Sequence, residues 1–190
     1  MRKISVLLTA VAAAASAPAF AADLTGPRVE AVLGWDHVRA NAAGVGHANT
    51  DGFLYGLGLG YDFGVGNNVA FGLDAEISDS TADFDVTSGT TRARLSAGRD
   101  LYAGGRITGA VSEKFNVYAK VGYTNARLKG SVTTGTTTTS ASGNADGVRA
   151  GLGAQYMLGT NAYLGAEYRY SNYEAGLSRH QVAGTIGYRF

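Results

Sequence analysis

The chain has 190 residues, no cysteine, and 16 Lys and Arg against 15 Asp and Glu. The lack of cysteine excludes disulfides, thiolate zinc sites and cysteine nucleophiles. The near-neutral charge offers no basic patch of the kind that neutralises phosphates, so nucleic acid is not expected as a partner.

Residues 1–21 are predicted to be a cleaved signal peptide. Arg2 and Lys3 form a basic start, an apolar run follows at 4–15, and small residues at 19–21 suit cleavage. The run is too short for a membrane-spanning helix, and no later stretch reaches the required length of about twenty apolar residues. Cleavage leaves one domain, 22–190, with 14 basic against 15 acidic residues and a net charge of −1.

The domain is predicted to be all-β, because apolar residues alternate with small or polar ones at a period of two. In 53–63, for example, Phe53, Tyr55 and Leu57 share one side and Gly56 and Gly58 the other. Eight segments show this pattern: 29–36, 53–63, 69–78, 101–111, 115–124, 148–156, 163–170 and 182–190. Most approach the roughly 9–11 residues of a tilted membrane-crossing strand. The sequence therefore predicts an eight-stranded antiparallel up-and-down transmembrane β-barrel.

The connections support this prediction. Short links near 64–68, 112–114 and 159–161 alternate with long polar ones near 38–51, 79–91, 129–146 and 172–180. Short periplasmic turns and long external loops are typical of outer-membrane barrels. The third long loop is rich in Thr, Ser and Gly and cannot pack a core, so we expect it to be mobile.

A soluble β-sandwich or a lipocalin-like barrel would also alternate. Such a fold would leave Tyr and Phe in water on every strand, a larger apolar patch than soluble monomers expose. Contact with lipid removes this difficulty and favours the membrane barrel.

Three segments carry a resemblance to known proteins: Leu101–Arg106, Tyr118–Arg127 and Arg179–Phe190. They resemble the small outer-membrane β-barrel proteins related to opacity proteins, a porin-like family of Gram-negative bacteria. The resemblance covers essentially all of 22–190 and implies eight strands and an outer-membrane location. In such proteins a terminal Phe preceded by alternating apolar residues is the signal for the barrel-assembly machinery. The matching residues here are Val182, Ile186, Tyr188 and Phe190, with Gly184 the weakest position.

The inward stripe predicts a charge network of both signs in the lumen. Its members are Glu30, Asp62, Asp74, Glu76, Arg94, Asp100, Arg106, Lys120, Arg149, Glu167, Arg169 and Arg189. Side chains fill the lumen of an eight-stranded barrel, so we expect ion pairs and waters rather than an open channel. The alternative is a selectivity ring, as in larger porins.

Aromatic residues near the strand ends are predicted to form girdles at the two membrane interfaces. They are Trp35, Tyr55, Tyr61, Tyr123, Tyr156, Tyr168 and Tyr170; carbohydrate binding is the alternative. Arg99 breaks the outward apolar pattern just above the lipid band. It is interpreted as a contact for lipopolysaccharide phosphates or as a solvated rim residue.

Three histidines test an enzyme hypothesis. His37 and His180 lie near the outer rim of the first and last strands, which become neighbours when a barrel closes, and His47 lies in the first loop. A hydrolase could use a Ser, His and carboxylate set. However, lipid-A deacylase barrels place a His two residues before the Ser, whereas Arg169 stands before Ser171. We therefore expect no enzyme and no catalytic, cofactor or metal site.

Two functions remain open. The first is a structural and surface-interaction role, in which the barrel anchors four external loops. Its expected partners are outer-membrane lipid and lipopolysaccharide, the assembly machinery during insertion, and host or phage ligands at the loops. The alternative is a narrow porin-like channel for ions or small solutes.

Overall fold

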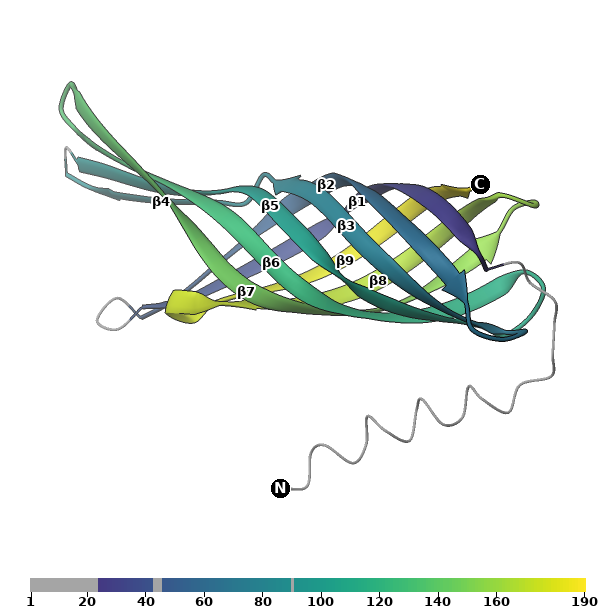
Figure 1. Cartoon of the computed structure of the whole chain (residues 1–190). Helices are drawn as coiled ribbons and strands as arrows, with labels where there is room; N and C mark the ends of the chain where they lie inside the picture. The colour runs from purple at the N-terminus through teal and green to yellow at the C-terminus, as the bar shows by residue number, and fades with distance from the viewer. Residues whose placement is uncertain (1–23, 43–45, 90) are drawn as a thin grey trace.

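The computed structural model describes residues 24–42, 46–89 and 91–190, and this part of the chain is almost entirely β-strand (Figure 1). The predicted signal peptide lies outside the described residues. The elements in chain order are β1 (Gly26–Ala42), β2 (Gly46–Gly64), β3 (Val69–Ser80), β4 (Asp83–Ser88), β5 (Thr91–Ala110), β6 (Phe115–Thr134), β7 (Thr137–Met157), β8 (Ala162–Tyr173), the short 3-10 helix η1 (Glu174–Gly176) and β9 (Leu177–Arg189). No helix in these ranges is both long and apolar enough to cross a membrane.

The strands form a closed antiparallel barrel. Consecutive strands pair with one another, except that β3 pairs with β5, and β1 pairs with β9 from Arg28↔Arg189 to Ala40↔Leu177. The ring of pairings therefore runs β1, β2, β3, β5, β6, β7, β8, β9 and back to β1. Figure 1 shows these strands tilted around one central axis.

The prediction of eight strands is wrong, because the described residues form nine. The additional strand is β4, in the segment predicted as the long loop 79–91. It pairs with the first residues of β5, from Asp83↔Ser96 to Ser88↔Thr91, beyond the end of β3. The sequence here, Asp83-Phe84-Asp85-Val86, does alternate, but over too few residues to stand out from a polar loop.

Two long hairpins extend past the barrel wall. The segment 129–146, predicted as a loop, is instead a hairpin, because β6 continues to Thr134 and β7 begins at Thr137. Gly135 turns the chain between them with a φ of +59°. Threonine favours the extended backbone, and ladder hydrogen bonds need no apolar core. We call residues 83–89, 91–97 and 127–145 the arm, which Figure 1 shows projecting from one end of the barrel.

The opposite end of the barrel carries the short connections. The links 65–68, 111–114 and 158–161 all lie there, as the sequence predicted. The start of β1 and the C-terminal residue lie at the same end (Figure 1). We call this the turn end and the other the arm end.

The barrel wall is apolar outside and polar inside. Buried and exposed residues alternate along β3 without interruption from Ala70 to Ser78. On β2, Leu57 and Leu59 point outward and are 64% and 62% exposed, whereas the inward Asp62 is fully buried. This is the reverse of a soluble barrel, and it suits a wall surrounded by lipid.

Apolar side chains pack together in the interior toward both ends. Toward the arm end, six buried residues form a cluster that we call the apolar cap: Val38, Ala82, Ala126, Ala145, Tyr173 and Leu177, with Phe84, Ala97 and Leu128 packed against it. Toward the turn end, Leu24 packs against Ala70 and Ala110. The sequence predicted ion pairs and waters in the lumen, but not these apolar layers.

Candidate functional site

The barrel interior holds fourteen buried charged side chains, which we call the interior charge network. Seven are acidic and seven are basic, so the interior is neutral overall, and none is more than 8% exposed among the residues described. They are Arg28, Glu30, Asp36, Asp62, Asp74, Glu76, Asp100, Arg106, Lys120, Arg149, Glu167, Arg169, Arg179 and Arg189. A buried charge is costly unless it is paired, and a balanced set allows every charge a partner.

Nearest the turn end, two arginines share three carboxylates. Arg28 on β1 pairs with Glu30 at 3.2 Å, with Asp62 at 2.9 Å and with Asp74. Arg106 on β5 reaches the same Glu30 at 3.2 Å and the same Asp74 at 3.1 Å. Because Glu30 and Arg106 lie on β1 and β5, their ion pair crosses the lumen rather than following the wall.

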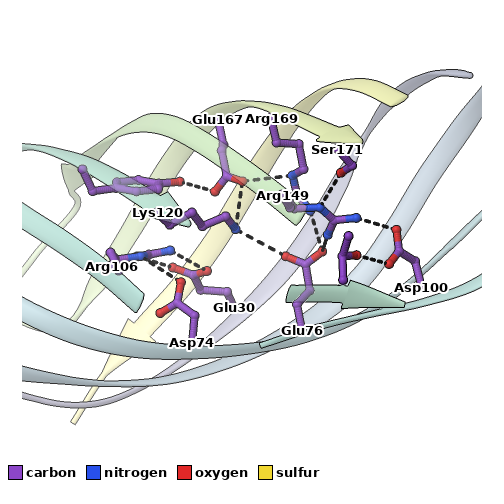
Figure 2. A network of polar contacts seen from close by, with 12 residues as sticks. Glu30, Asp74, Glu76, Asp100, Arg106, Lys120, Arg149, Glu167, Arg169 and Ser171 are labelled. Atoms are coloured by element: carbon purple, nitrogen blue, oxygen red, sulfur yellow. Dashed lines mark hydrogen bonds and ion pairs between the residues drawn. The ribbon is translucent and has the colours of Figure 1, made fainter. Parts of the chain in front are cut away.

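At the centre, Lys120 joins two glutamates, as Figure 2 shows. Its Nζ lies 2.8 Å from Glu167 Oε1 and 3.7 Å from Glu76 Oε2. Arg169 contacts the same two carboxylates, at 2.9 Å and 2.5 Å. The hydroxyl of Tyr118 donates a hydrogen bond of 2.7 Å to Glu167. Each glutamate is thus held by several groups from different strands.

Toward the arm end, Asp100 is the shared acceptor. It pairs with Arg149 and, at 3.1 Å, with Arg179, which also pairs with Asp36. Tyr173 donates a hydrogen bond of 2.6 Å to Asp100 and at the same time packs in the apolar cap. Arg149 also lies 3.6 Å from the central Glu76, so the arm-end and central groups are joined by an ion pair. The turn-end group meets the central one through Tyr118, because the guanidinium of Arg106 lies over its ring.

The structure buries eleven of the twelve residues predicted for the lumen, but Arg94 does not join them. Its side chain is 48% exposed and pairs with Asp83 on the outer face of the arm. The reason is a β-bulge in β5: between Ala97 and Asp100, the two residues Gly98 and Arg99 lie opposite the single residue Arg127 of β6. An extra residue reverses the inside and outside positions beyond it. Even-numbered residues of β5 face inward below the bulge and outward above it.

Sequence reasoning also missed three members of the network: Arg28, Asp36 and Arg179. Arg28 and Asp36 share the inward side of the predicted segment 29–36 with Glu30, so the alternation carried their signal although they were not named as members of the network. Arg179 lies on the inward side of β9, three residues before the predicted segment 182–190 begins.

The predicted girdle residues all lie on the outer surface of the wall. Trp35, Tyr55, Tyr61, Tyr123, Tyr156, Tyr168 and Tyr170 are between 39% and 59% exposed. The residues of the predicted assembly signal also face outward, with Val182, Ile186, Tyr188 and Phe190 between 44% and 67% exposed.

The two rim histidines face each other across the closing pair of strands, which confirms the predicted neighbourhood: His37 on β1 is the register partner of His180 on β9. His37 Nδ1 lies 2.6 Å from Asp51, and the Tyr168 hydroxyl lies 2.7 Å from His180 Nδ1. In the described ranges no group of three or more His, Asp or Glu side chains is arranged to hold a metal ion.

The comparisons with known proteins agree with this geometry. The sequence matches the family model of the outer membrane protein beta-barrel domain over residues 7–190. Ail, the attachment invasion locus protein of Yersinia pestis, has a similar structure, with 16% identity and a TM-score of 0.58 over 88% of this chain and 100% of Ail. Ail in complex with the heparin analogue sucrose octasulfate gives 16% identity and a TM-score of 0.55 over the same shares.

Neisserial surface protein A is also similar, with 19% identity and a TM-score of 0.54 over 87% of this chain and 98% of that one. At such identities the likeness concerns the fold alone. A search of curated proteins finds no match. Because the family match spans nearly the whole sequence, the chain belongs to the outer membrane protein β-barrel family and is a protein of the Gram-negative outer membrane.

Proposed function

We propose that this protein is a sealed membrane anchor with a structural and surface-interaction role. The observation that carries the proposal is the filled interior, in which the fourteen buried charges are balanced and apolar side chains pack toward both ends. The barrel would hold the arm and the neighbouring connections outside the cell, since long connections of such barrels are extracellular.

Ion flow would meet two obstacles along the lumen. Apart from the Tyr173 hydroxyl, which is held by Asp100, the side chains of the apolar cap offer no polar groups to replace the hydration shell of an ion, and apolar constrictions resist wetting. Below it, an ion would have to separate pairs such as Lys120–Glu167 and Arg106–Asp74, which bridge different strands. Both features favour a plug over a conduit.

Single-channel recording in planar bilayers tests the proposal directly. We expect the refolded mature protein to show no steady, discrete conductance. A double variant, Tyr173→Ala with Leu177→Ala, removes the two bulkiest buried side chains of the cap and is expected to leak measurably more than the parent. Discrete openings of the unaltered protein would contradict the sealed barrel and support the alternative, a narrow channel for ions or small solutes.

We further propose that the arm and the other arm-end connections bind host or phage ligands. Loops on a rigid scaffold commonly carry recognition, and the structure of Ail in complex with a heparin analogue shows that a protein of this fold can bind a sulfated saccharide. Replacing residues 132–139 by Asn-Gly would join Ser131 to Ser140, which are register partners, through a two-residue turn. We expect this shortened protein to insert normally but to lose binding to whole host cells. Unchanged binding would contradict a role for the arm tip.

The outer wall would serve insertion and lipid contact. The exposed aromatic residues are proposed to lie at the two lipid interfaces, and the last strand is proposed to present Phe190 to the assembly machinery. Removal of Phe190 is expected to lower the amount of folded protein in the outer membrane while the precursor is still exported. An unchanged folded yield would contradict this role.

A further inference from the structure

The outer face of the arm becomes basic above the point where it leaves the barrel wall. On β6 the outward residues Val121 and Tyr123 are 58% and 53% exposed, as expected for lipid contact. Asn125, whose register partner is Asp146, comes next on this face, and Arg127 and Lys129 follow it. Arg127 is four positions after Tyr123, which is about 13 Å along the strand. The basic side chains therefore lie just above the lipid-facing wall and point away from the barrel axis.

The bulge in β5 brings a third basic residue to this face. Gly98 and Arg99 together lie opposite Arg127, between the register pairs Ala97↔Leu128 and Asp100↔Ala126. A side chain on Gly98 would point toward Lys129, whose Cε lies 3.9 Å from the Cβ position. The extra residue thus adds Arg99 to an outer face that already carries Arg127 and Lys129.

A hollow of about 410 Å³ lies on this face. It spans β5, β6 and β7. Two basic residues, four serines and two small residues line it: Arg127, Lys129, Ser96, Ser131, Ser140, Ser142, Gly130 and Ala141. Serine hydroxyls and basic side chains are the groups that bind phosphates and the sugars that carry them.

The positive charge of this hollow is not used inside the protein. Higher on the same face, Arg92 and Arg94 pair with Asp85 and Asp83. By contrast, Arg127 contacts only a neutral hydroxyl in the contacts described, that of Ser142 at 3.3 Å.

Arg99 carries a buried Nε that has no hydrogen-bond partner within the described part of the chain. The acid on this side of β7, Asp146, already accepts hydrogen bonds from Tyr123 and Asn125. Asp79 follows the register pair Ser78↔Asp100 on the neighbouring β3, but within the described residues it makes no ion pair with Arg99. The described part of the chain thus leaves Arg99, Arg127 and Lys129 without an ion pair, so they are available to an anion from outside the chain.

We infer that Arg99, Arg127, Lys129 and the serine-lined hollow form a binding site for the phosphate groups of lipopolysaccharide in the surrounding outer leaflet. The site faces away from the barrel axis rather than along it, and it lies one polar pair, Asn125 and Asp146, above the last outward aromatic residue, Tyr123. Both features favour a lipid headgroup over a soluble ligand approaching from above. The inference does not depend on whether the lumen conducts or the arm tip binds a host ligand.

The test measures lipopolysaccharide binding to the protein in phospholipid nanodiscs. The triple variant Arg99→Gln, Arg127→Gln and Lys129→Gln is compared with the parent and with Lys114→Gln, an exposed lysine of the turn end. One basic residue near an anionic surface changes affinity roughly fivefold, so the triple variant is expected to bind on the order of 100-fold more weakly. Heat-modified gel migration checks that each variant is folded.

The ligand chemistry is separated by repeating the measurement with two further probes. Enzymatically dephosphorylated lipopolysaccharide is expected to bind parent and triple variant equally weakly. The soluble core oligosaccharide phosphate, without lipid, is expected to bind the parent far less tightly than the intact molecule. An unchanged affinity of the folded triple variant, an equal loss in Lys114→Gln, or full binding of the lipid-free saccharide would each overturn the inference.

Discussion

Removing the charge of Lys120 tests whether the interior charge network stabilises the barrel. The substitution Lys120→Ala would leave seven acids against six bases in a site where no charged group is more than 8% exposed. Removing one partner of a buried pair costs about 3–5 kcal/mol. Both glutamates keep other partners, because Arg169 contacts each of them and Tyr118 still donates to Glu167. We therefore expect a loss near the lower limit, about 3 kcal/mol.

The loss can be measured by urea unfolding in lipid vesicles. Trp35 is the single tryptophan of the chain and lies on the outer wall, so its emission reports when the barrel leaves the bilayer. The urea midpoint of Lys120→Ala is expected to fall clearly, and the heat-resistant gel band to disappear at a lower temperature. Lys114→Ala, at an exposed site, is the matched control and should leave both unchanged.

A second variant separates charge balance from packing. The pair Lys120→Met with Glu167→Gln removes one charge of each sign and restores neutrality, so part of the stability is expected to return. The reasoning is refuted if Lys120→Ala unfolds at the same urea midpoint as the parent. It is also refuted if the double variant loses as much stability again, relative to Lys120→Ala, as Lys120→Ala loses relative to the parent.

Three further predictions follow from other contacts. Arg94→Ala is expected to leave the midpoint of the same urea assay nearly unchanged, because its pair with Asp83 is largely exposed; a loss as large as that of Lys120→Ala would mean that Arg94 is buried. Gly122→Ala is expected to cost at least about 1–3 kcal/mol, because its Cβ would overlap the backbone of β5, and an unchanged midpoint would disprove this overlap. The hydrogen bond with His37 holds the pKa of Asp51 below its ordinary value, so the stability from this contact is present at neutral pH and is lost as the pH falls through that lowered pKa, below about pH 4. Titration by NMR should show a higher Asp51 pKa in His37→Ala, and no change would exclude the hydrogen bond as the cause.

The wall of the barrel could be predicted from the sequence because lipid imposes a strict rule on it. Each outward position must be apolar or aromatic, so the stripe from Val29 to Trp35 or from Phe53 to Phe63 can be followed residue by residue. Outside the membrane the rule ends, since water can satisfy either face of a strand. The arm was therefore missed, and its threonine-rich hairpin was interpreted as a loop.

The interior could be predicted in composition but not in pairing. Alternation alone indicates that Glu30 and Arg106 face inward, but their contact across the lumen depends on how β1 and β5 are staggered around the ring. The bulge at Gly98 and Arg99 shows the same limit, because one extra residue reversed the side on which Arg94 lies. A glycine beside an outward arginine is the sequence signal that could have indicated it.

The pairing of β1 with β9 means that the barrel cannot close until its last strand arrives. Until then β1 and β8 would each present a row of unpaired backbone groups, which hydrocarbon cannot satisfy. The first strand of the domain therefore lacks one of its two partners until the last strand is in place. The pairing of β1 with β9 ends at Phe190, whose amide donates a hydrogen bond of 2.9 Å to the Pro27 carbonyl. A nascent chain cut short in β8 would have no stable resting state in the bilayer and would remain a substrate for periplasmic chaperones and proteases.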